Sequence, residues 1–210
     1  MGTVLSIAER ELIVAMHEAG HVVACVRLGV PFSSVSIDFF GPGRGAGVET
    51  EAHFFPAAGT GVSDRMARKG NDDLPRSLAA YIQRCRQQVI VCLAGRAAEE
   101  RAALFGLTRG VGVESDLKDL RDARYFLREA VRAEDADPRQ ADSKAVGLET
   151  RPAQLVSEMA QLRIEAAELI SEHFSYVRMV AQLLTAKKRL TAVEVAQVVG
   201  LAGLADNSLG

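Results

Sequence analysis

Two histidines and a glutamate near the start of the chain have the types and spacing of a metal site. The segment His17-Glu18-Ala19-Gly20-His21 fits the HExxH pattern. In a helix with 3.6 residues per turn, the two histidines lie one turn apart on the same face, so both imidazoles can reach one ion. Glu18 lies about 100° further round the helix, where a general base for a metal-bound water is needed. The alternative is a buried histidine pair with Glu18 on a solvated face.

Zinc is the ion that this donor set favours. Neutral imidazole suits zinc, and a hydrolytic zinc site needs three protein ligands and an open fourth position for water. The motif supplies two of these ligands. No third histidine follows at the metzincin spacing, and no Met-turn signature is present. We therefore expect Zn²⁺ as the cofactor, with a downstream aspartate or glutamate as the third ligand and Glu18 as the catalytic base.

Three segments, in this order, resemble the zinc metallopeptidase domain of the FtsH family. Residues 14–24 are similar to the family's opening helix with its HEAGH sequence, residues 93–100 to its GGRxAEE helix, and residues 112–118 to its GASNDI segment. The similarity extends from about residue 8 to the C-terminal helices. It implies a zinc-dependent metalloendopeptidase in which Asp116, the aspartate of the last segment, is the third zinc ligand.

Local chemistry also makes Asp116 a reasonable ligand. Ser115 can cap a helix that begins near Asp116, and the helix dipole favours an ionised carboxylate in the first turn. The plainer interpretation is an ordinary acidic residue of a first helical turn. Glu99 is the rival third ligand, because the small residues of 94–98 allow its helix to pack against the motif helix. We favour Asp116 and expect Glu99 to accept a hydrogen bond from a histidine N–H.

The resemblance also carries expectations about partners. FtsH-type proteases join this domain to a membrane anchor and an ATP-driven unfolding module, but the chain contains no GxxxxGK[ST] loop. We therefore expect a flexible polypeptide or peptide substrate, or a separate AAA ATPase partner, and no ATP use by the chain itself. The family's rings make a homo-oligomer an open expectation. Two alternatives are a catalytically idle zinc-binding adaptor for peptides or an ATPase, and a helical scaffold without metal.

The amino-acid composition narrows the kinds of protein that this chain can be. The chain has 210 residues, 48% hydrophobic content and a net charge of −2, which favours a single domain over 1–210 and gives no reason to expect nucleic acid. Its three cysteines lack CxxC spacing and fit reduced core residues of a cytoplasmic protein. No stretch reaches the roughly 18 apolar residues of a membrane span, and no signal peptide is recognisable.

The expected fold class is mainly α (α+β), a helical domain with a small β-hairpin or sheet beside the HExxH helix. Gly20 costs about 1 kcal/mol in a helix interior, so we expect another part of the chain to approach it closely. From apolar periodicity and turn residues we expect a metal helix at 8–29, a hairpin at 35–55, a loop at 56–74, a helical part at 75–200 and a tail at 201–210.

Within that hairpin the strands are expected at 35–40 and 48–55. Within the helical part we expect helices at 75–104, with Gly95 as a candidate break, at 115–132, at 152–186 and at 191–199, and an exposed linker at 133–150. The last of these helices has a capping box made by Thr191 and Glu194.

Overall fold

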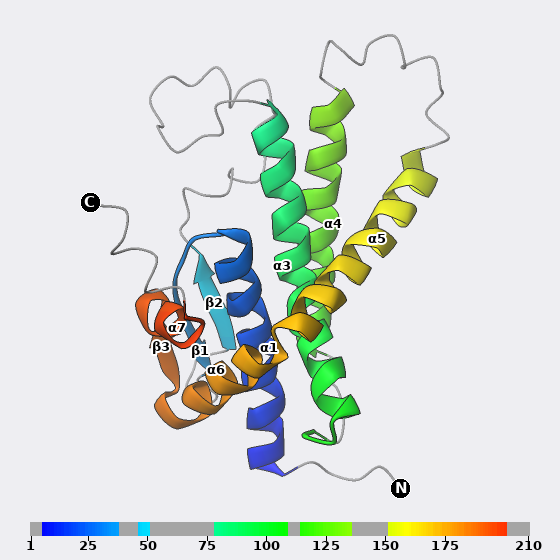
Figure 1. Cartoon of the computed structure of the whole chain (residues 1–210). Coiled ribbons are helices and arrows are strands. Elements are labelled where there is room, and N and C mark those ends of the chain that lie inside the picture. The colour runs from blue at the N-terminus through cyan, green and yellow to red at the C-terminus, as the bar shows by residue number, and fades with distance from the viewer. Residues whose placement is uncertain (1–5, 38–45, 51–77, 109–113, 136–150, 201–210) are drawn as a thin grey trace, which may run out of the picture.

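The computed structural model describes residues 6–37, 46–50, 78–108, 114–135 and 151–200. It is mainly helical with a small antiparallel sheet, which confirms the expected fold class (Figure 1). The elements are, in chain order, α1 (Ile7–Leu28), β1 (Phe32–Ile37), β2 (Ala46–Thr50), α3 (Leu78–Leu104), α4 (Glu114–Asp135), α5 (Arg151–Glu172), α6 (Phe174–Lys187), β3 (Arg189–Thr191) and α7 (Ala192–Val198).

Helix α1 has strong signals at both ends. The hydroxyl of Ser6 accepts a hydrogen bond from the backbone N–H of Glu9, and the Glu9 carboxylate accepts one from the backbone N–H of Ser6. This reciprocal capping box starts the helix one residue before the predicted 8–29 segment. Gly29, with φ of 67°, ends it in the left-handed conformation that glycine adopts without a steric penalty.

The middle of α1 is buried on every face, from Ala15 to Cys25. It packs against α3, α6 and the sheet, so it forms the centre of the molecule. Gly20 faces α3, and a Cβ there would lie 2.6 Å from the carbonyl oxygen of Ala94 and 2.7 Å from the Cβ of Ala98. The close approach expected at Gly20 is therefore confirmed, and its partner is the small-residue stretch of α3.

The sheet has the order β2-β1-β3, with both pairings antiparallel. Val35 in the central strand pairs with Val48 on one side and Leu190 on the other. The hairpin is confirmed in kind, although β1 begins at Phe32, before the predicted residue 35. Residues 38–45 and 51–77 lie outside the described part, and so do the end of the second predicted strand, the predicted loop 56–74 and the tail 201–210.

The sheet's third strand was not predicted. β3 has three residues, which is too short to show the period-two pattern of a strand. It leads directly into α7, where the capping box of Thr191 and Glu194 is confirmed.

The helical part differs from prediction in one important place. A single helix at 152–186 is wrong, because the chain leaves helical geometry at His173, with φ of −106° and ψ of 18°. The break lets α5 pack against α3 while α6 turns to cover α1. No proline or glycine marks the break, and apolar residues continue on both sides of it. The hydrophobic periodicity alone therefore predicts one continuous helix.

Helix α3 ends at residue 104 as predicted, whereas α4 departs from its predicted limits. Helix α3 continues through Gly95, and α4 extends from Glu114 to Asp135, past the predicted end at 132 and into the predicted linker 133–150. Residues 136–150 are not among those described. Figure 1 shows α3 and α4 side by side, with α5 crossing them obliquely.

The burial of the cysteines agrees with the expectation that they are core residues. All three cysteines are buried and none forms a disulfide, and burial raises the pKa of Cys25 to about 12, which keeps its thiol neutral. No helix in the described ranges combines the length and apolar character that crossing a bilayer requires.

Candidate metal centre

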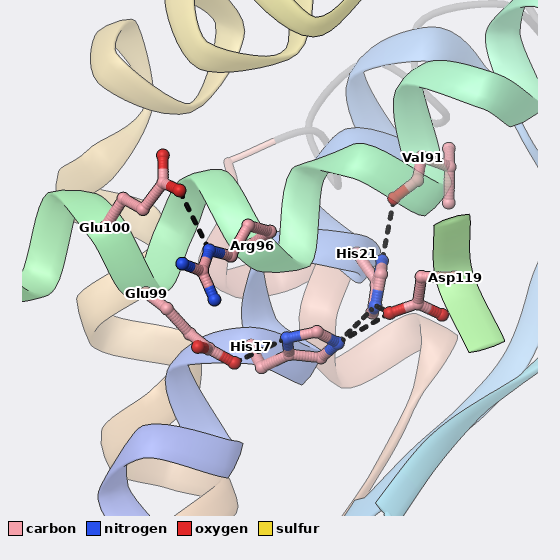
Figure 2. A network of polar contacts seen from close by, with 7 residues as sticks. All are labelled: His17, His21, Val91, Arg96, Glu99, Glu100 and Asp119. Carbon is pink, nitrogen blue, oxygen red and sulfur yellow. Dashed lines mark hydrogen bonds and ion pairs between the residues drawn. The ribbon is translucent and has the colours of Figure 1, made fainter. Parts of the chain in front are cut away.

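Three side chains from two helices meet at one point in the interior. His17 and His21 come from α1 and Asp119 from α4, and their polar ends turn toward one another (Figure 2). The Nε2 atoms of the two histidines are 2.9 Å apart. The Oδ2 atom of Asp119 lies 2.9 Å from Nε2 of His17 and 3.4 Å from Nε2 of His21. These three residues form a group that could hold a metal ion.

Hydrogen bonds on the far side of each ring determine where its proton lies. Nδ1 of His21 is 2.7 Å from the carbonyl oxygen of Val91, which can only accept, so Nδ1 carries the hydrogen. Nδ1 of His17 is 2.7 Å from Oε1 of Glu99, and an ionised carboxylate also only accepts. In the neutral rings both Nε2 atoms therefore present bare lone pairs, the form in which imidazole binds a metal.

Two lone pairs and a carboxylate oxygen at such short separations repel one another unless a positive charge lies among them. In the metal-free protein that charge is a proton. Burial by itself favours the neutral ring, but the hydrogen bonds to Asp119 and Glu99 outweigh it and raise the pKa of His17 to about 10. For Asp119, burial is likewise outweighed by the hydrogen bonds to His17 and His21, and its pKa is held well below its usual range. A positive charge among these three side chains is therefore strongly stabilising.

The spacing of the donors suits a tetrahedral ion. Zinc binds imidazole nitrogen and carboxylate oxygen at about 2.0–2.1 Å, so neighbouring donors in a tetrahedral site lie about 3.3 Å apart. The three separations here, 2.9, 2.9 and 3.4 Å, lie close to that value. The residues present therefore fit the ion that the sequence suggested.

The backbone of α3 forms one wall of this group at Gly95. A Cβ at this position would lie 2.6 Å from Nε2 of His21 and 2.7 Å from Nε2 of His17. Ordinary van der Waals contact begins at 3.4 Å, so no side chain can be accommodated here without moving an imidazole. Gly95 was considered from the sequence only as a candidate helix break. Its actual importance is the space that it leaves for the two donor atoms.

Glu18 lies beside the group and is also buried, at 5% exposure. Its Oε2 atom has no hydrogen-bond partner among the described residues. Burial raises the pKa of Glu18, and the neighbouring charges of His21 and His17 act in the opposite direction. The alternative of a solvated Glu18 is wrong. A buried carboxylate with an oxygen left without a partner is suited to accepting a proton.

Glu99 has the position of a supporting residue. The prediction that it accepts a hydrogen bond from a histidine N–H is confirmed by its contact with Nδ1 of His17. Because this contact is on the opposite edge of the ring from Nε2, Glu99 does not join the donor group. Glu99 is 1% exposed, so its charge acts in a medium that screens it poorly.

The carboxylate that meets the histidines is Asp119, one turn beyond the Asp116 implied by the resemblance. Asp116 lies in the first turn of α4 as expected, but its side chain is outside the described part of the structure. The helix begins at Glu114, so Ser115 lies inside the helix and is not its cap, contrary to prediction.

The burial of its neighbours on α4 explains why Asp119 faces the histidines, although the sequence alone does not distinguish it from Asp116. Each aspartate is followed by a leucine, but Leu117 is 73% exposed whereas Leu120 packs against a core cluster. Ala123 and Leu127, four and eight residues after Asp119, are buried as well. Asp119 therefore lies in the row of α4 residues that faces the interior.

The likeness to the FtsH peptidase domain thus rests on the three sequence segments. The first contains His17 and His21, the second contains Glu99, and the third ends one residue before Asp119. In comparisons with known proteins, no family model matches the chain, and no curated protein matches it.

Proposed function

We propose that this protein is a zinc-dependent metalloendopeptidase that resembles the proteolytic domain of FtsH. The observation that carries the proposal is the convergence of two imidazole Nε2 atoms and a carboxylate oxygen in a buried site next to Glu18, whose Oε2 atom has no partner among the described residues. A structural histidine pair would not need both Nε2 atoms turned toward one another and toward an anion. A buried base beside them has an evident use in hydrolysis.

In this proposal His17, His21 and Asp119 hold the ion. Zinc, when bound, would acidify a water molecule and polarise the scissile carbonyl. Glu18 accepts the proton of the attacking water and then donates it to the leaving amine, and its raised pKa brings it closer to the neutral range in which both transfers are efficient. Glu99 and the carbonyl of Val91 keep each imidazole in the tautomer that leaves Nε2 free.

The proposed substrate is a flexible polypeptide. Within these 210 residues no phosphate-binding GxxxxGK[ST] loop is present, so unfolding of a stable substrate would need an ATPase outside these residues. In the described sheet, β2 has β1 as its only neighbour, and its other edge could pair with an extended substrate segment. A homo-oligomer similar to the family's rings is part of the same proposal.

The test is cleavage of casein by the zinc-loaded protein, with and without a chelator, compared with Glu18→Gln. We expect the variant to keep its zinc and to lose at least the 10²- to 10⁴-fold that general base catalysis contributes. Glu172→Gln is the matched control, since its side chain is 77% exposed and should change nothing. Cleavage by Glu18→Gln at the wild-type rate would contradict the mechanism. Zinc binding without cleavage of any polypeptide would favour the adaptor alternative.

A further inference from the structure

A pocket lies between α3, α4 and α5, directly beside the proposed metal group. Its charged lining residues are Arg96, Glu100, Asp119 and Arg163, and its apolar lining includes Leu93 and Leu120. Asp119 belongs both to this pocket and to the group formed with the histidines, so the two are adjacent. Figure 2 shows Arg96 and Glu100 on the same helix as Glu99, which supports His17.

The acidic side chains that line this pocket have partners, whereas one of its two arginines has none among the described residues. Nε of Arg96 lies 2.8 Å from the Glu100 carboxylate, and the Asp119 carboxylate faces the imidazoles. Both acidic side chains of the pocket therefore have partners already. The guanidinium of Arg163 forms no ion pair or hydrogen bond with any other described residue. The pocket therefore presents a guanidinium cation that no carboxylate of the described residues neutralises.

The chemistry of the lining indicates the ligand. A guanidinium is a planar fork of N–H donors that matches the two oxygens of a carboxylate. Leu93 and Leu120 offer apolar surface for the aliphatic part of the residue that carries such a carboxylate. We propose that this pocket binds a carboxylate of the polypeptide substrate, held by Arg163, close to the bond that is cleaved. This proposal rests on the proposed peptidase function.

Two sources could supply such a carboxylate: an acidic side chain and the C-terminus of a peptide. Three fluorescent peptides of equal length separate them: one with an internal glutamate and an amidated end, one with glutamine and an amidated end, and one with glutamine and a free C-terminal carboxylate. Their dissociation constants are measured by anisotropy on zinc-loaded Glu18→Gln, which should not cleave them.

We expect at least one carboxylate-bearing peptide to bind about fivefold more tightly than the fully amidated glutamine peptide, the upper range for a solvent-accessible ion pair. In the Arg163→Gln background the preference should disappear. Arg163 is exposed, so its replacement should leave folding intact. Arg178→Gln, an exposed arginine on α6 outside the pocket, is the matched control and should retain the preference.

Equal binding of all three peptides, or a preference that survives Arg163→Gln, would overturn the inference. Which carboxylate-bearing peptide binds more tightly identifies the source of the group. Because binding is measured without turnover, the two proposals fail separately. If the wild type cleaves casein but shows no carboxylate preference, the peptidase proposal stands and the pocket assignment is wrong. If the preference depends on Arg163 but no cleavage occurs, the pocket assignment stands and the peptidase proposal is wrong.

Discussion

Replacement of Gly95 by alanine tests the arrangement of the metal group most directly. The new Cβ would lie 2.6 Å from Nε2 of His21 and 2.7 Å from Nε2 of His17. Reaching the 3.4 Å of ordinary contact from 2.7 Å requires a displacement of at least about 0.7 Å. Metal sites tolerate ligand distances within about 0.2 Å of their usual values. The displacement is several times larger, so we expect zinc affinity to fall at least 10- to 100-fold, the range seen when ligand orientation is lost.

Gly20→Ala is the matched control at the same helix contact. Its Cβ would meet the carbonyl oxygen of Ala94 at 2.6 Å and the Cβ of Ala98 at 2.7 Å, but neither imidazole is among its nearest contacts. Both variants overpack the contact between α1 and α3 and should lose about 1–3 kcal/mol of stability in chelator. Only Gly95→Ala brings a new atom against the donor nitrogens, so its loss of zinc affinity should be much the larger.

The assay measures zinc affinity by competition with a chelating dye and stability by urea unfolding, each with and without zinc. Wild-type protein should gain stability on zinc addition, because a ligand that binds only the folded state shifts the equilibrium toward it. Gly95→Ala should lose most of this gain. A Gly95→Ala protein that binds zinc within about threefold of the wild type would refute the reasoning, since the imidazoles could not then be in contact with this backbone.

Three further predictions concern single carboxylates. Asp119→Asn should lose zinc binding in metal analysis while Asp116→Asn retains it, and the opposite result would restore the ligand implied by the resemblance. Glu99→Gln should lower zinc affinity by about 10- to 100-fold in the dye competition, because the amide keeps the hydrogen bond but loses the charge; unchanged affinity would reduce Glu99 to a packing role. The pKa of Glu194 is lowered from 4.5 to about 2 by Lys187 and Thr191, so its ionised form stabilises the fold above pH 4.5 and this contribution is lost as the pH falls toward 2. The stability difference between wild type and Glu194→Gln should therefore shrink in urea titrations from pH 5 to pH 2.5, and a constant difference would argue against this linkage.

Local signals explain the parts of the fold that were predicted well. The capping box at Thr191 and the glycine that ends α1 determine backbone geometry within a few residues, whatever the rest of the chain does. The same holds for the relation between His17 and His21, because helix geometry alone places them on one face. The close approach at Gly20 was also predictable, since a helix-destabilising residue in a helix interior needs a reason.

Features that depend on distant contacts were missed. The break at His173 has no local marker, because it arises from the different packing partners of α5 and α6. β3 exists only through its pairing with β1, a contact of residues far apart in the chain. The resemblance pointed to Asp116. Asp116 and Asp119 are three residues apart on the same helix, and only the orientation of α4 against its neighbours decides which of them faces the histidines.

The pairing of β1 with β3 has a consequence for biosynthesis. Arg189 donates a hydrogen bond to Ser34 across 155 residues of sequence, and α6, which covers α1, lies just before Arg189. At ribosomal rates of about 5–20 residues per second, the helix that carries the histidines emerges about 8–30 s before these partners exist. During that interval its apolar faces have no native cover on the side of α6. The nascent chain should therefore depend on chaperones at this stage, and more strongly when translation is slow.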